Sequence, residues 1–133
     1  MSNLQAVYYR AADGSEPVLD FVMKLHAKRR AALLNQVGRL NLLSDSTPHL
    51  PFPLSSQVEG ELRELRCHVG SEHYRVLYQR SGRLVVLLHA FLKTTGKLPR
   101  GEVKIAQDRW EDFKARMDAP LRKPPRAAGH DAP

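Results

Sequence analysis

The chain has 133 residues, of which 42% are hydrophobic, and it carries a formal net charge of +7. This length allows one domain with one modest core, and the hydrophobic fraction is too high for a wholly disordered chain. The longest apolar run, residues 84–88, is too short to span a membrane. The basic charge favours an anionic partner, either nucleic acid or an acidic protein.

The cysteine and histidine content bears on the cellular compartment and on metal binding. Cys67 stands alone, so no disulfide can form within the chain, and we interpret it as a buried core residue of a cytoplasmic protein. The first residues lack the basic and then apolar pattern of a secretory signal. The six histidines are scattered without metal-ligand spacing, so the sequence predicts neither a metal nor another cofactor.

The N-terminal part predicts one strand and two helices. Residues 4–10 form the predicted strand, and Ser15 is a candidate N-cap for a first helix. That helix has apolar residues at helical spacing, namely Val18, Phe21, Val22 and Leu25. A second helix is predicted from about Ala27. The two closely joined helices should cover one face of a sheet.

The middle of the chain predicts a loop and then a run of strands. Residues 44–56 contain three prolines, which exclude a regular helix or a central strand. The predicted strands span residues 61–69, 73–80 and 83–93. Gly70 supplies positive φ for the first turn between them, and Ser81-Gly82 marks a tight hairpin.

The last predicted element is a helix that starts near Pro99. Its apolar stripe, which we interpret as core rather than as a base-stacking surface, is Val103, Ala106, Trp110, Phe113 and Met117. Residues 118–133 are rich in proline and small residues and are predicted to be disordered, so residues 1–117 form the folded domain. The order of elements predicts an α+β fold, a small twisted and mainly antiparallel sheet with two N-terminal helices and one C-terminal helix packed on it.

Strand alternation gathers polar side chains on one face of the predicted sheet. In the last strand, one face would hold Leu84, Val86, Leu88, Ala90 and Leu92, and the other Val85, Leu87, His89, Phe91 and Lys93. The strand 61–69 would present Leu62, Glu64, Arg66 and His68 together. With an ordinary hairpin register, Arg66 and Arg75 share a concave face with His89 and Lys93.

Two guanidiniums, an imidazole and an ammonium suit RNA cleavage without a metal. A ribose 2′-hydroxyl must lose its proton and attack the adjacent phosphate, which gains charge in the transition state. Arginine forks clamp phosphate through parallel hydrogen bonds, and electrostatic stabilisation of this kind is often the largest catalytic contribution. Histidine is the usual general acid or base near neutral pH. On an otherwise apolar face, however, a histidine is more often part of the core.

The segments "LRELR", "YRVLYQ" and "VVLLHAFLKTTGKLP" resemble the RelE/HigB toxins of type II toxin–antitoxin pairs. The similarity is greatest to the phage-derived branch, whose members carry "LLHAF-x-K-x-T" before the last helix, and it covers residues 4–117. The resemblance implies a small twisted sheet covered by helices on one face.

The chemistry of RNA cleavage, together with the resemblance, gives individual residues expected roles. Arg75 matches the arginine of the family's "YR-x-x-Y" strand and would be the transition-state phosphate ligand, with Arg66 as a second phosphate contact. His89 would act as acid or base or would orient the RNA, and Lys93 would neutralise charge near the leaving group. The RNA backbone would be bound by Arg63, Lys97, Arg100 and Lys104.

The chain departs from the best-known family pattern in two places. Leu62 and Glu64 stand where those toxins often carry two lysines, and the last helix has no tyrosine. The identity of the general base is therefore left open.

The expected function is that of a metal-independent, ribosome-dependent mRNA endoribonuclease that inhibits translation in the cytoplasm. Its partners would be the ribosome and a cognate helix-turn-helix antitoxin, with DNA reached only through that antitoxin. A basic patch at the junction of the first two helices, Lys24, Lys28, Arg29 and Arg30, is either a solvated face or a contact for ribosomal RNA or the antitoxin. The alternatives are a ParE-like gyrase poison of the same fold and a non-enzymatic phage-derived binding module.

Overall fold

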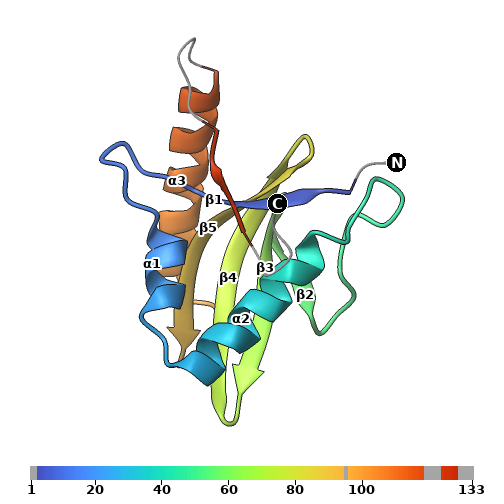
Figure 1. The fold of residues 1–133 in the computed structure, drawn as a ribbon, viewed down its shortest axis with the longest axis vertical. Helices are drawn as coiled ribbons and strands as arrows, with labels where there is room; N and C mark the ends of the chain where they lie inside the picture. Colours follow the sequence, from blue (N-terminus) through green and yellow to red (C-terminus); the bar gives the residue numbers. More distant parts are fainter. Residues whose placement is uncertain (1–2, 95, 119–123, 129–133) are drawn as a thin grey trace.

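The computed structural model describes residues 3–94, 96–118 and 124–128. Its elements in chain order are β1 (Gln5–Tyr8), α1 (Pro17–Met23), α2 (Ala27–Leu40), β2 (Ser55–Glu59), β3 (Leu62–Val69), β4 (Glu72–Ser81), β5 (Leu84–Lys93), α3 (Arg100–Met117) and β6 (Arg126–Ala127). The described strands form one sheet in the order β2-β3-β4-β5-β1-β6 (Figure 1). Among these strand pairs only β1 and β5 run parallel. The predicted α+β class is confirmed.

Helices cover both faces of the sheet, whereas the family resemblance implied helices on one face. On one face, α1 and α2 bury apolar residues such as Val22 and Leu33 against the strands. On the other face, α3 packs Val103 and Phe113 against the sheet. The reason lies in β5, where four consecutive residues, Val85 to Leu88, are buried and therefore require an apolar partner on each side.

A β-bulge in β5 changes which side chains share a face. Leu77 of β4 pairs with His89, but the next residue, Tyr78, pairs with Leu87, so Leu88 is the extra residue. Beyond the bulge the alternation is reversed. The strict alternation predicted from the sequence was therefore wrong for this strand, because Ala90 joins the α1/α2 side and Phe91 joins the α3 side.

The proline-rich segment ends in a strand that the sequence analysis did not predict. The strand β2 pairs with β3 through Ser55 opposite Leu65 and Ser56 opposite Glu64, and its register is irregular between Gln57 and Glu59. Its composition is mostly polar because it lies at the edge of the sheet, and a polar edge strand gives little hydrophobic alternation to detect. The rest of the segment is a loop, as predicted.

Part of the predicted disordered tail also forms a strand. Within β6, Ala127 pairs antiparallel with Val7 of β1, and the following residue, Ala128, is 1% exposed. The Asn41 side chain fastens this edge: its Oδ1 accepts a hydrogen bond from the Ala6 N–H at 2.7 Å, and its Nδ2 donates to the Ala128 carbonyl at 2.9 Å. Residues 119–123 and 129–133 lie outside the described residues.

The hairpin turns lie where the sequence predicts them, whereas the start of the first helix differs. Gly70 and Gly82 have φ values of 61° and 57°, which confirms the two predicted hairpin turns. The first helix begins later than predicted, because Glu16 is its N-cap, while Ser15 donates to the Asp13 carboxylate instead. No helix in the described ranges is long and apolar enough to cross a membrane.

Asn41, directly after α2, should contribute strongly to the free energy of unfolding, because its side chain bonds to backbone groups of two other segments. Asn41→Ala would leave the buried Ala6 N–H and Ala128 carbonyl without their side-chain partner, so we expect a loss of roughly 1–3 kcal/mol in the free energy of unfolding, measured by urea denaturation. Asn35→Ala, an exposed asparagine on the same helix, is the matched control. Equal effects of the two substitutions would contradict the assignment.

Candidate functional site

The part of the α3-side sheet face near the β3–β4 hairpin carries a cluster of basic side chains. We define this "basic face" by its residues, Arg66, His68, His73, Arg75 and Lys93. The register places them in rows across three strands: Arg66 lies opposite Arg75, His68 opposite His73, and His73 opposite Lys93. Because these positions alternate by two along each strand, their side chains point to the same side of the sheet.

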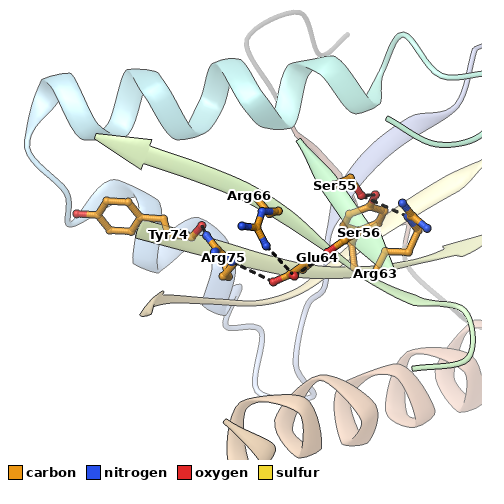
Figure 2. Close-up of polar contacts among 8 residues, drawn as sticks. Ser55, Ser56, Arg63, Glu64, Arg66, Tyr74 and Arg75 are labelled. Carbon is orange, nitrogen blue, oxygen red and sulfur yellow. Dashed lines mark hydrogen bonds and ion pairs between the residues drawn. The ribbon is translucent and has the colours of Figure 1, made fainter. Parts of the chain in front are cut away.

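Glu64 lies at the centre of the charged groups on β3 and β4. Its Oε1 is 3.0 Å from Arg75 Nε, and its Oε2 is 3.4 Å from Arg66 Nη1. Ser56 of the edge strand β2 adds a hydrogen bond of 2.7 Å from its hydroxyl to Glu64 Oε2. Figure 2 shows the two guanidiniums converging on this one carboxylate. The carboxylate therefore separates two cations that face each other across the strand pair.

Arg75 is almost wholly buried, with 3% of its surface exposed. Its Nη1 donates to the Tyr74 carbonyl at 3.1 Å. The Nε–H is close to Glu64 Oε1 but is not aligned for a hydrogen bond, so within the described residues both atoms are buried without a hydrogen-bond partner. Burial, and then the Arg66 charge, lower the pKa of Arg75, whereas Glu64 raises it. The guanidinium remains charged, since arginine is not deprotonated in proteins.

Arg66 is the more accessible of the two arginines, with 29% of its side chain exposed. Its guanidinium lies over the ring of Phe52, 5.3 Å from the ring centroid, and Phe52 itself is an exposed residue of the loop before β2. Contacts of this kind at exposed sites are worth roughly 0.5–1 kcal/mol. Arg66 is thus held in place by Glu64 on one side and Phe52 on the other while still facing solvent.

His89 is engaged by α3 through both ring nitrogens. Its Nδ1 lies 3.2 Å from Arg109 Nη1, and its Nε2 lies 2.8 Å from Glu102 Oε1. Because an arginine can only donate, Nδ1 must accept, and the proton is therefore assigned to Nε2, which donates to the carboxylate. Burial is the largest cause that lowers the pKa of His89, while Glu102 opposes the shift. The imidazole is a neutral link between β5 and α3.

The remaining predicted residues lie outside the cross-strand rows that make up the basic face. Arg63 lies on the α2 side of the sheet, where its Nε donates to Ser55 Oγ at 3.3 Å, so the structure does not bring it to Arg66. Arg100 and Lys104 are exposed on α3 and paired with Glu59 at 3.3 Å and Asp108 at 2.7 Å. Lys97 is exposed in the connection between β5 and α3.

Arg63 instead lines a cavity of about 590 Å³ on the α2 side of the sheet. Tyr78 and Arg80 of β4 and His49 of the proline-rich loop also line it. Burial, followed by the charges of Arg63 and Arg80, lowers the pKa of His49. This cavity is separated from the basic face by the sheet itself.

Sequence reasoning did not select three residues that the structure places in or beside the basic face, namely Glu64, His68 and His73. The alternation of β3 did place Glu64 and His68 beside Arg66. The sequence did not show which β4 residue lies opposite each of these β3 residues, because that depends on the register of the hairpin. Among the described residues, no three His, Cys, Asp or Glu side chains come together in a group that could hold a metal ion.

A mostly antiparallel six-stranded sheet with three helices is an α+β fold consistent with RelE-like toxins. The model of the family "Phage derived protein Gp49-like (DUF891)" matches residues 20–111, which include the whole basic face. The chain is 33% identical over 108 residues to "Probable endoribonuclease HigB1" of Mycobacterium tuberculosis, in each of two strains, and the match covers 80% of this chain and 82% of the relative. The chain belongs to the Gp49-like family of HigB-type toxins.

The environment of His89 predicts loss of stability in mild acid. Its pKa is lowered in the folded state, so the unfolded chain binds the proton more readily, and stability falls as pH drops below about 6.5 towards the folded value. His89→Gln should flatten the dependence of the melting temperature on pH between 7.5 and 5. Some dependence should remain, because His49 is shifted in the same direction. His26→Gln, at an exposed position, is the control.

Removal of the Glu64 carboxylate should destabilise the protein strongly. Glu64→Ala leaves the buried Arg75 cation without a counter-charge, and breaking a buried pair from one side costs roughly 3–5 kcal/mol. Arg66→Ala removes only a partly exposed partner and should cost about 1 kcal/mol or less. Chemical denaturation of both variants, with the exposed Glu61→Ala as control, measures the difference. Similar costs for Glu64→Ala and Glu61→Ala would show that the pair is not a stabilising contact.

Proposed function

We propose that this chain is the toxin of a type II toxin–antitoxin pair and that it cleaves mRNA. The family and the name of the similar mycobacterial protein support an endoribonuclease. The observation that carries the proposal is the convergence of the partly exposed Arg66 and the buried Arg75 on one carboxylate. Two guanidiniums that meet on a carboxylate can also meet on a phosphate, because the planar fork of arginine matches both anions.

The proposal gives the two arginines different roles. Arg66 is the direct phosphate ligand, since it faces solvent. Arg75 lies opposite it on β4 and, being buried, supplies a second, fixed positive charge. A phosphate oxygen that displaced the Glu64 carboxylate would also give the buried Nε–H of Arg75 an aligned acceptor. Lys93, on the same face, neutralises the charge that develops on the leaving oxygen.

His89 serves as a positioning residue in this proposal rather than as a proton carrier. Both ring nitrogens are committed to α3, and 14% of its side chain is exposed. Its ring also stacks on Phe91 with the centroids 5.5 Å apart, and Phe91 pairs directly with Arg75. His89 thus holds the end of β5, and with it Lys93, in place against β4.

Ribosome dependence is proposed from the charge at the hairpin end of the molecule. In Figure 1 the α1–α2 junction and the β3–β4 hairpin lie at the same end, and Arg29 of α2 is paired with Glu72 of β4. The exposed Lys24 and Lys28 of that junction therefore lie at the same end of the molecule as the basic face, although α1 and α2 cover the other side of the sheet. Ribosomal RNA would bind this end through its phosphates, and cleavage of mRNA held there would stop translation. Such binding weakens steeply as salt rises.

The proposed regulatory partner is a cognate helix-turn-helix antitoxin in the cytoplasm. An acidic segment of that antitoxin would be attracted to the same positive field, because the chain carries a net charge of +7. DNA would be reached only through the antitoxin.

The test is mRNA cleavage in a translating extract, mapped by primer extension with and without ribosomes. The wild-type chain should cut only when ribosomes are present. Arg66→Ala should reduce the cutting rate roughly 10²–10³-fold, the usual effect of removing one well-placed electrostatic donor. Arg83→Ala is the matched control, because Arg83 also lies 3.4 Å from a carboxylate, that of Asp45, but at the β4–β5 turn.

Other outcomes identify other functions. Arrested growth of cells that express the chain, with intact mRNA, would indicate a ParE-like gyrase poison instead. Neither arrest nor cleavage would indicate a binding module. Equal loss of cutting in Arg66→Ala and Arg83→Ala would contradict the placement of the site.

A further inference from the structure

Two exposed histidines face each other across β3 and β4 beside the hairpin turn. His68 and His73 are directly paired in the register, and their ring centroids lie 5.9 Å apart with an angle of 40° between the ring planes. The next strand places Lys93 directly opposite His73. Two imidazoles and an ammonium therefore form one row across three strands.

This row lies immediately beside the two arginines. His68 is two residues along β3 from Arg66, and His73 is two residues along β4 from Arg75, so all four side chains point to the same side of the sheet. A phosphate held by Arg66 would thus lie next to both imidazoles. Both histidines are exposed, so they can exchange protons with solvent and with a bound substrate.

His89, the other described histidine on this side of the sheet, is unsuited to moving protons. The Nδ1 of His89 accepts from Arg109 and its Nε2 donates to Glu102, so neither nitrogen is available to a substrate without breaking a contact to α3. The acid and base that RNA cleavage requires must come from elsewhere on the face.

We propose that His68 and His73 are the general base and the general acid of RNA cleavage, an inference that rests on the proposed function. His68 takes the proton of the 2′-hydroxyl as the O2′–P bond forms. His73, beside the Lys93 ammonium, gives its proton to the 5′-oxygen as the P–O5′ bond breaks. The products are a 2′,3′-cyclic phosphate and a 5′-hydroxyl, and one proton has moved from His73 to His68.

The geometry of the pair fits this reaction. The attacking and leaving oxygens flank a single phosphorus atom, and each must come within about 2.6–3.2 Å of its imidazole nitrogen. Rings that approach one phosphodiester from two sides must therefore stand several ångströms apart on a common surface. His68 and His73 meet this condition across adjacent strands, and exchange with water resets their protons after each turnover.

The first measurement is single-turnover cutting of mRNA on programmed ribosomes by full-length His68→Gln and His73→Gln. Each variant should cut about 10²–10⁴-fold more slowly than the wild type, the usual contribution of a general acid or base. Their melting temperatures should stay near the wild-type value, because both side chains are exposed. His49→Gln, in the proline-rich loop on the α2 side of the sheet, should cut at the wild-type rate.

A modified mRNA separates the two roles. Replacement of the 5′-oxygen at the cleavage site by sulfur gives a leaving group that needs no proton. A thiol has a pKa of about 8.5 in model peptides, so the sulfur can leave as the thiolate. His73→Gln should then recover to near the wild-type rate, while His68→Gln should stay slow. Recovery of neither variant, or of both, would overturn the assignment of acid and base.

Two further outcomes distinguish this inference from the proposed function. Wild-type rates for His68→Gln and His73→Gln on unmodified mRNA would overturn the role of the pair and leave the proposed ribonuclease standing. No cutting by the wild-type chain would overturn the proposed function, and the role of the pair would fail with it.

Discussion

The ion pair between Glu64 and Arg75 is the constraint on which the rest of the site depends. Arg66 and Arg75 lie directly opposite each other across an antiparallel strand pair, where like charges destabilise a sheet. The Glu64 carboxylate lies within reach of both, at 3.0 Å from one and 3.4 Å from the other. A buried cation is tolerable only with such a partner, since its desolvation otherwise costs several kcal/mol. The Glu64 carboxylate therefore allows two arginines to lie opposite each other on β3 and β4. It thereby also holds two positive charges close together at one point of the sheet.

The bulge at Leu88 decides how much of this face remains open. By adding one residue to β5, it turns both Leu88 and His89 towards α3, and Arg109 then binds the Leu88 carbonyl at 2.9 Å as well as the imidazole. Bulges re-aim side chains and leave backbone groups unpaired, and here a helix side chain satisfies the exposed carbonyl. The helix is thereby fixed over the apolar part of the face, where Phe113 packs, while His68 and His73 of the basic face remain exposed.

The two edges of the described sheet are protected by different means. At one edge, β2 is short, mostly polar and irregular in register, features that discourage pairing with another chain. At the other edge, β6 covers β1, and Asn41 joins both strands to α2. The Gp49-like match, residues 20–111, contains neither β1 nor β6 but contains the whole basic face. The residues proposed for chemistry thus lie within the part that is shared with the family.

The sequence by itself determined the α+β class and the positions of the long elements, because hydrophobic periodicity and glycine turns are local signals. It placed Arg66 and Arg75 on a shared face only on the condition of an ordinary hairpin register, which the structure has. Only the tertiary structure placed helices on both faces, added β2 and β6, and set Arg63 apart from Arg66. It also showed that His89 is bound by α3 and that His68 meets His73. These features depend on the bulge, on cross-strand register and on contacts between residues distant in the chain, none of which is encoded in the spacing of residues along one segment.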